Sequence, residues 1–171
     1  MEHSKIIDRF VGSLDRLEVA WTRVSENDGA AALEEIVEGP AVGAPLPVFE
    51  TGALAALGVT VDPTPRQIAA ARTGVTAASL GIADYGSVVV EGGPDATEAA
   101  SLFPERHVAV LRTADVVPDM TAALGRLGPL LREEATTAII ATGPSATADM
   151  GALVKGAHGP KAVHVLLVDP D

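Results

Sequence analysis

The segment ATGPSATADMGALVKGAHGPKAVHVLLVD, Ala141 to Asp169, carries the strongest signals for how this chain folds. The residues just before it, Thr137 to Ile140, are apolar and β-branched, which predicts a buried strand. Gly143 and Pro144 interrupt that strand, and short polar residues alternate after them, as they do where a helix begins. A strand, a Gly turn and a helix in this order place backbone N–H groups at the carboxyl edge of a sheet, where open α/β folds usually bind ligands.

The rest of the chain alternates short apolar runs with helical patterns, which predicts an α/β fold: a mainly parallel sheet with helices on both faces. An amphipathic helix is expected at about 4–26, because Ile6, Phe10, Leu14, Leu17 and Trp21 are three and four residues apart. Further strands are expected at Gly58–Asp62, Leu80–Ala83, Ser87–Glu91, His107–Leu111 and Val163–Val168. Further helices are expected at Gly52–Leu57, Thr64–Ala78, Ala96–Leu102 and Asp115–Leu131, with an irregular connection at Glu38–Pro47. No composition shift divides the chain, so we expect one domain, 1–171.

Composition excludes several classes of function. The net charge of −11 and the pI near 4.7 disfavour binding to nucleic acid or to anionic membranes. The chain has no Cys, so disulfides, thiolate-held iron–sulfur clusters and Cys-based zinc sites are excluded within it. No apolar run is long enough to span a bilayer, and the N-terminus lacks a secretory signal, so a cytoplasmic location is expected. An acidic surface with only three lysines is also typical of halophile proteins.

The loop after Pro144 is the leading candidate site. Backbone N–H groups near Gly143, together with the hydroxyls of Ser145 and Thr147, could hold a carboxylate or phosphate at the start of a helix. The alternative is that Ser145 or Thr147 only caps that helix. Asp149 favours the helix dipole, but its charge opposes an anion.

Two other turns are candidates. His158 and Gly159 lie in a Gly–Pro turn, where His158 could act as a general acid or base, hold a ligand oxygen, or only fix the loop. Asp84 and Ser87 flank the turn before the strand SVVVE and could project towards the sheet edge, although such turns commonly have no function. His107 and His164 lie in apolar strands and are expected to be structural. The histidines show no metal-ligand spacing and no nucleotide motif is present, so we expect no metal and no cofactor.

At these residues the chain resembles the lactate utilization (LUD) family, in its LutC/YkgG branch. The family pattern, close to GPS-x-TADIE-xx-LVxGxHGP, matches GPSATADMG at 143–151, LVKG at 153–156 and HGP at 158–160. Two further family elements match ADYGS at 83–87 and PERHV at 104–108, so the resemblance covers roughly the second half of the chain. The sequence departs from the pattern at Gly151, which replaces an acidic residue. It also departs at Tyr85 and Ala146, whose side chains contribute less to binding an anion than the usual family residues do.

The resemblance implies a fold similar to glucosamine-6-phosphate deaminase, ribose-5-phosphate isomerase and CoA transferases. It also implies partners: an iron–sulfur subunit and a second redox subunit that together oxidise lactate to pyruvate. The first hypothesis is therefore an auxiliary, ligand-binding subunit of such a system. The alternative is a stand-alone enzyme of the sugar-phosphate isomerase or acyl-transfer type, with Asp84 or His158 as proton carrier and the Ser145 loop as phosphate cradle. A third hypothesis is an assembly scaffold that docks a partner through the helix carrying Leu17 and Trp21.

Overall fold

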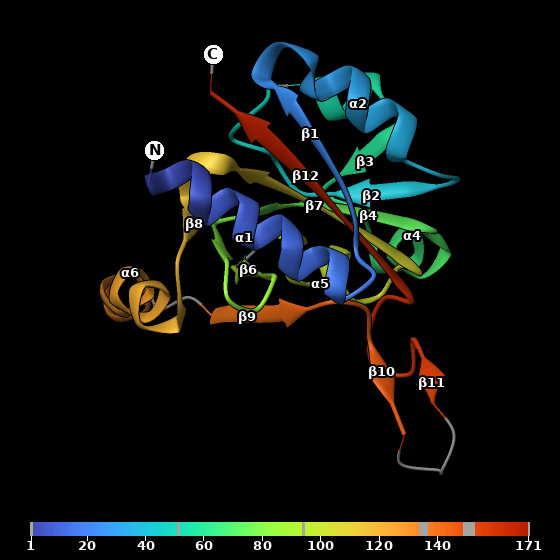
Figure 1. Ribbon diagram of the computed structural model, residues 1–171. Coiled ribbons are helices and arrows are strands. Elements are labelled where there is room, and N and C mark those ends of the chain that lie inside the picture. The colour runs from blue at the N-terminus through green and yellow to red at the C-terminus, as the bar shows by residue number, and fades with distance from the viewer. Residues whose placement is uncertain (1, 51, 94, 134–136, 149–152, 171) are drawn as a thin grey trace.

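The first sheet of the computed structural model (Figure 1) contains six parallel strands in the order β1-β12-β7-β4-β2-β3. The structure describes residues 2–50, 52–93, 95–133, 137–148 and 153–170. The strands of this sheet are β1 (Ala20–Ser25), β2 (Ala41–Gly43), β3 (Val59–Val61), β4 (Thr73–Ala78), β7 (Arg106–Arg112) and β12 (Ala162–Asp169). The expected α/β class with a mainly parallel sheet is confirmed.

A second sheet of four strands has the order β8-β5-β6-β9. Its strands are β5 (Leu80–Ile82), β6 (Ser87–Gly92), β8 (Val116–Val117) and β9 (Thr137–Thr142). β5 pairs with β8 in parallel, whereas β6 is antiparallel to both β5 and β9. The chain passes from the first sheet to the second at Ser79, whose backbone N–H donates to the carbonyl of Val89 at 2.9 Å. Residues 73–82 therefore join the two sheets almost as one continuous strand.

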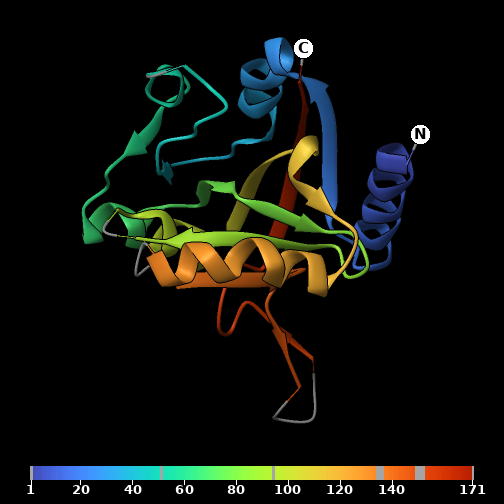
Figure 2. The same cartoon turned by 90° about the vertical axis from the view of Figure 1, so that its left-hand side faces the viewer.

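Helices cover both faces of the first sheet, as Figure 2 shows. The helices are α1 (Glu2–Arg16), α2 (Gly29–Ile36), α3 (Ala53–Ala56), α4 (Pro65–Ala70), α5 (Thr97–Leu102) and α6 (Met120–Glu133), with 3-10 turns η1 (Glu26–Asp28) and η2 (Thr113–Asp115). Alternation along β7 decides the packing: Ala109 and Leu111 contact the α1 side, and Val108 and Val110 contact the α2 side. α6 packs on the second sheet.

One glycine fixes how closely α5 approaches the first sheet. A Cβ atom at Gly74 in β4 would collide with the backbone carbonyl of Ala100 in α5, so only glycine fits there. This close approach holds α5 over β4, between the two sheets, where its residues line one of the cavities described below.

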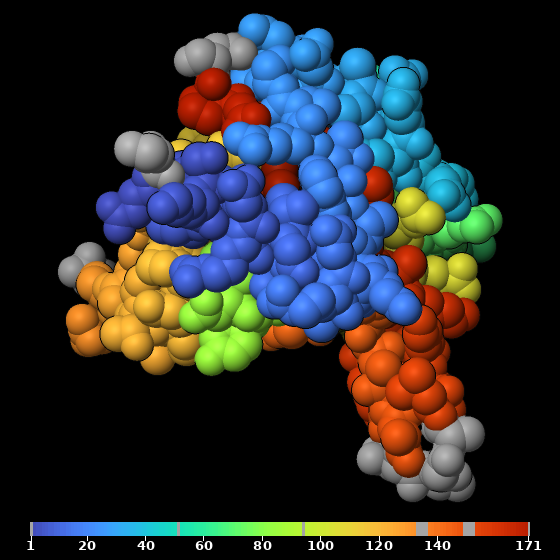
Figure 3. Space-filling view, in the orientation of Figure 1, coloured from blue at the N-terminus to red at the C-terminus, as the bar shows by residue number. Residues whose placement is uncertain are grey.

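The segment after Pro144 differs most from expectation. Instead of opening a helix, it forms a hairpin in which β10 (Ala146–Thr147) pairs antiparallel with β11 (Val154–Lys155). Figures 1 and 3 show this hairpin projecting from the body of the molecule. The reason lies at its base, where the carbonyl of Ser145 accepts the N–H of Gly156 at 2.8 Å. That carbonyl pairs across the hairpin instead of starting a helical turn.

Four other expectations were wrong in detail. The helix expected at Asp115–Leu131 begins only at Met120, because Val116 and Val117 form β8 and pair with β5. The N-terminal helix ends at Arg16, because Glu18 takes a positive φ of 56° and the chain turns into β1. Trp21 therefore lies in a strand, not on a docking helix. The expected helix Thr64–Ala78 keeps its Thr64 capping box but ends at Ala70, and its Ala-rich remainder is the buried strand β4. The expected irregular connection Glu38–Pro47 contains the short strand β2, which the sequence did not indicate because the segment is rich in Gly and Pro.

Candidate functional site

Two cavities lie at opposite ends of the parallel strands. The first, which we name the motif pocket, has a volume of about 300 Å³ and lies at the amino ends of β7 and β12. Its lining residues include His107, Ile139, Ala141, Gly143, Ser145, His158, Gly159 and Val163. The second, the carboxyl-edge cavity, has a volume of about 410 Å³ and lies where β4 and β7 end. Its lining residues include Pro45, Ser79, Glu91, Asp95, Arg112 and Asp115.

The motif pocket forms because Ser145 ties two bends together. Its N–H donates to the carbonyl of Pro160 at 2.9 Å, and its Oγ accepts the N–H of His158 at 3.3 Å. Gly159 packs directly against it, since a Cβ atom there would lie 3.2 Å from the Ser145 Cβ. Gly143 takes a φ of 69°, a left-handed conformation that favours glycine, and so turns the chain out of β9. The two Gly-containing bends therefore lie side by side.

The position of this pocket corrects the expectation that it lies at the carboxyl edge of a parallel sheet. β9 is the edge strand of the second sheet and pairs antiparallel with β6, so Gly143 follows no parallel strand. The other bend, ending at Pro160, comes just before β12 begins. Both bends consequently lie at the amino ends of the parallel strands. β9 is also only half-buried, not the buried strand expected from its composition.

The structure brings some of the predicted site residues together and separates others. Gly143, Ser145, His158 and Gly159 all line the motif pocket. Thr147 lies in β10 of the hairpin and does not line it, and Asp149 falls outside the residues that the structure describes.

The turn before β6 contributes to neither cavity. Ser87 is buried and its hydroxyl bonds the hydroxyl of Thr142 at 2.7 Å. The Asp84 carboxylate pairs with the Arg9 guanidinium at 3.3 Å, on the side of α1. Neither Asp84 nor Ser87 lines either cavity.

The charges and hydrogen-bond donors around the motif pocket do not favour a buried anion. The backbone N–H groups of Ser145, Gly156 and His158 all donate within the protein. No Lys or Arg is among its described lining residues, and Lys161 nearby pairs with Glu105 at 3.0 Å. An anion here would lose its hydration without a cation in return.

His107 is a lining residue whose importance the sequence did not reveal. Its side chain is only 2 % exposed, and burial lowers its pKa from 6.5 to about 4, so the imidazole is neutral at physiological pH. Nε2 lies 2.8 Å from the Thr76 hydroxyl. Among the described residues, none forms a hydrogen bond with Nδ1. Every side-chain polar atom in those residues that is fully shielded from solvent has a hydrogen-bond partner, so Nδ1 cannot be fully shielded. Nδ1 therefore stays open to the motif pocket. The family element that begins at Pro104 contains this residue, but an apolar strand favoured a structural role.

The carboxyl-edge cavity occupies the position that the strand order favours for a ligand. From β2 the chain proceeds to β3 on one side, whereas from β4 it proceeds to β7 on the other side. Such a reversal opens a crevice beyond the carboxyl ends of the two strands, which is where open α/β sheets usually bind ligands. Pro45 follows β2 and Ser79 follows β4, so the cavity lies in this crevice.

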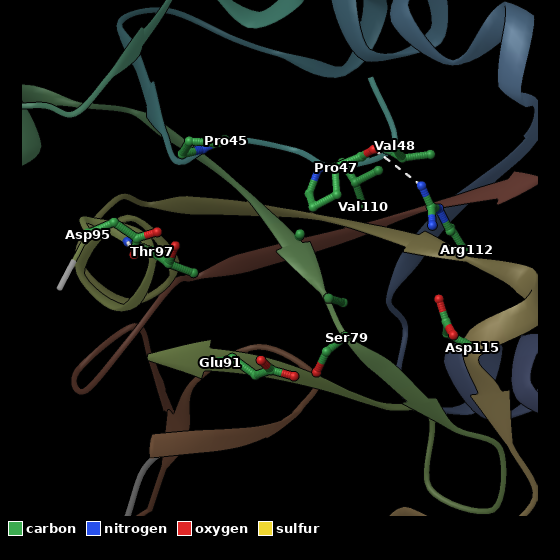
Figure 4. A pocket seen from close by; sticks show the side chains of 12 residues that line it. Pro45, Pro47, Val48, Ser79, Glu91, Asp95, Thr97, Val110, Arg112 and Asp115 are labelled. Carbon is green, nitrogen blue, oxygen red and sulfur yellow. Dashed lines mark hydrogen bonds between the residues drawn. The ribbon is translucent and has the colours of Figure 1, made fainter. Parts of the chain in front are cut away.

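The polar groups of this cavity come from the ends of separate strands (Figure 4). Arg112 ends β7, and its Nη2 donates to the carbonyl of Pro47 at 3.2 Å. Glu91 lies near the end of β6, and Figure 4 shows its carboxylate close to Ser79, away from Arg112. Asp115 pairs with Arg126 at 3.6 Å. In the sequence, such a residue could be recognised as a charged residue at the end of an apolar run, as in SVVVE and HVAVLR.

Within the described ranges, no cluster of three or more His, Asp or Glu side chains is placed to hold a metal ion. Nor does any helix in those ranges combine the length and the apolarity needed to cross a membrane.

The sequence is similar to curated proteins over part of its length. The chain is 32% identical over 108 residues to Lactate utilization protein C of Bacillus subtilis (strain 168), and 34% identical over 103 residues to that of Anoxybacillus flavithermus. It is 33% identical over 104 residues to Uncharacterized protein YkgG of Escherichia coli (strain K12). Each match covers 58% of this chain and 43% to 45% of the relative, so the chain spans less than half the length of these curated relatives.

A solved structure extends the likeness to almost the whole fold. The crystal structure of a DUF162 family protein from Deinococcus radiodurans matches with a TM-score of 0.73, over 98% of this chain and 99% of that chain. At 18% identity this likeness shows the fold alone. The LUD domain model matches residues 58–168, which include the second sheet, both cavities' polar residues and the hairpin base. This chain therefore belongs to the LUD domain family.

Proposed function

We propose that this chain is a ligand-binding component of a lactate utilization system, and that it binds a small 2-hydroxy monocarboxylate in the carboxyl-edge cavity. The single observation that carries the proposal is Arg112, which presents a guanidinium to a crevice at the strand-order reversal. The likeness to Lactate utilization protein C supports the choice of lactate as the first ligand to test.

The charges of the cavity select the kind of anion. The cavity is lined by one arginine and by three carboxylate residues, Glu91, Asp95 and Asp115, so a phosphate or other polyanion would meet net repulsion. A monocarboxylate needs only one cation. The guanidinium carries five N–H donors and uses one on Pro47, which leaves a pair for two carboxylate oxygens.

The hydroxyl of the ligand also has a partner. Asp95 accepts the backbone N–H of Thr97 at 3.0 Å, and Asp115 pairs with Arg126. The Asp115 carboxylate lies on the Arg112 side of the cavity in Figure 4, and its ion pair with Arg126 engages one oxygen, so it can accept a ligand hydroxyl beside the guanidinium. A 2-oxo acid lacks that proton and would place its carbonyl against a carboxylate. Lactate should therefore bind more tightly than pyruvate.

The redox chemistry in this proposal belongs to partner chains. This chain has no Cys to hold an iron–sulfur cluster, so electrons from lactate would pass to an iron–sulfur subunit and a second redox subunit. The role proposed for this chain is to bind and present the hydroxy acid or its product. The stand-alone enzyme has less support, because its proton carrier Asp84 pairs with Arg9 and lines neither cavity.

Calorimetric titration of the purified chain with lactate and pyruvate tests the site. Replacing Arg112 by Gln should weaken lactate binding by about 10- to 100-fold, because a charge-assisted hydrogen bond contributes roughly 1.5–3 kcal/mol. Arg66→Gln is the matched control, since Arg66 is an exposed arginine on α4 outside the cavity. Equal lactate affinity in wild type and the Arg112 variant would remove the site.

Growth on lactate tests the role. Deleting the gene should abolish growth on lactate but not on glucose. Complementation by the Arg66 variant should restore growth, and complementation by the Arg112 variant should not. Unchanged growth after deletion would remove the pathway, whatever the titration shows.

A further inference from the structure

We infer that the motif pocket is a second binding site, separate from the carboxyl-edge cavity, for a small apolar molecule that carries an uncharged carbonyl oxygen. The inference rests on His107, a buried side chain with a free polar atom inside a cavity. It does not depend on the proposed function, because it involves none of the residues around Arg112.

The hydrogen bond to Thr76 fixes which proton His107 carries. Among the described residues, the Thr76 hydroxyl has no other hydrogen-bond partner, so its proton has one acceptor, the His107 Nε2 at 2.8 Å. A hydroxyl that accepted from Nε2–H instead would leave its own proton buried without an acceptor, which is costly. Nε2 is therefore the acceptor, and Nδ1 carries the hydrogen. The pocket thus contains an N–H donor that the protein itself does not use.

The walls decide what this donor recognises. Ile139, Ala141 and Val163 give the pocket an aliphatic wall. Of its other polar lining residues, Ser101 donates to the carbonyl of Glu98 and Thr142 bonds Ser87. The Ser145 hydroxyl accepts the N–H of His158 and keeps its own proton for a ligand. Two donors beside an aliphatic wall suit one acceptor oxygen on an apolar group. A carboxylate would lose its hydration with no Lys or Arg in the described lining, whereas an amide, ketone or acyl carbonyl loses little.

A set of ligands with one carbon skeleton separates these chemistries. Isovaleramide offers a neutral carbonyl, isovalerate a carboxylate and isoamylamine an ammonium. Binding to the wild-type chain is measured by ligand-observed NMR and by shifts of the His107 ring nitrogens in long-range ¹H–¹⁵N spectra. We expect isovaleramide to bind at least about tenfold more tightly than isovalerate, to move Nδ1 more than Nε2, and isoamylamine not to bind. Tighter binding of isovalerate or isoamylamine would overturn the inference.

A pair of variants locates the binding without changing His107. Ala141→Leu fills the pocket from β9 and should reduce isovaleramide binding by at least about tenfold. Ala138→Leu makes the same change on the opposite face of the same half-buried strand and should leave binding unchanged. Arg112→Gln should also leave it unchanged. If neither Ala141→Leu nor Ala138→Leu reduces binding, or if both reduce it, the assigned site is wrong.

The free protein gives a test that needs no ligand and no variant. Its ¹⁵N spectrum should show His107 as the neutral Nδ1–H form at pH 7. Finding the proton on Nε2 would remove the donor from the pocket and overturn the inference. His107→Asn keeps an amide N–H near the Nδ1 position and should retain part of the binding, whereas His107→Leu should lose it while thermal unfolding confirms that the variant folds.

Discussion

At the scale of the residue, His107 should make the stability of this protein depend on pH. Burial lowers its pKa from 6.5 to about 4 in the folded state, so below pH 6.5 the unfolded chain binds the proton more readily. Stability from this group is complete above pH 6.5 and is lost as the pH falls towards 4. The shift corresponds to roughly 3 kcal/mol. Urea unfolding at pH 7.5, 5.5 and 4.5 should show a steeper loss in wild type than in His107→Asn.

The same scale shows what single residues could and could not predict. Gly143 and Gly159 predicted bends, and both lie in bends because glycine and proline act locally. Ser145 predicted a helix cap, but its N–H, carbonyl and hydroxyl bond residues 156–160 instead. Those partners are eleven or more positions away, and no local pattern records them. Arg112 was visible only as a charge that ends an apolar run.

At the scale of the element, β9 is the feature with a measurable consequence. It is the edge strand of the second sheet, and its residues, TAIIAT, include no charge and no proline. An uncharged edge strand is a template for pairing with other chains. Ile140 is 39% exposed on this strand, so Ile140→Lys should reduce aggregation on heating, measured by light scattering. Leu124→Lys, a similar change on α6, should have less effect. Equal effects would show that hydrophobicity alone, not the edge, drives aggregation.

Elements were predictable where their signal is local. β7 and β12 are near-continuous apolar runs, and both were expected within one or two residues. β4 was assigned to a helix because its sequence, TGVTAA, contains two alanines and only one large β-branched residue, Val75, and its strand state comes from pairing with β2 and β7. The hairpin of β10 and β11 was missed for the same reason, since its pairs join residues nine and seven positions apart.

At the scale of the whole molecule, the order and direction of the strands decide where the two cavities lie, and the position of a motif in the sequence does not. The order of strand, Gly turn and helix in the sequence suggested a ligand at the carboxyl edge of the sheet, yet the bends of that segment lie at the amino ends of β7 and β12. The cavity at the carboxyl edge is built from strand ends scattered between Pro45 and Asp115. Strand order cannot be derived from single strands, so this convergence was not predictable. The expectation of one domain, 1–171, remains a proposal that unfolding can test.

We propose that both sheets unfold together, as one domain. The chain runs directly from β4 into β5, and a single apolar cluster joins α1 through Phe10 to Leu111 of the first sheet and Val88 of the second. Neither sheet can lose its packing without exposing this cluster, so unfolding should be one cooperative transition. Far-UV circular dichroism, Trp21 fluorescence from β1 and the near-UV signal of Tyr85, beside β6, should give the same urea midpoint. Separate midpoints for Trp21 and Tyr85 would divide the chain into two folding units.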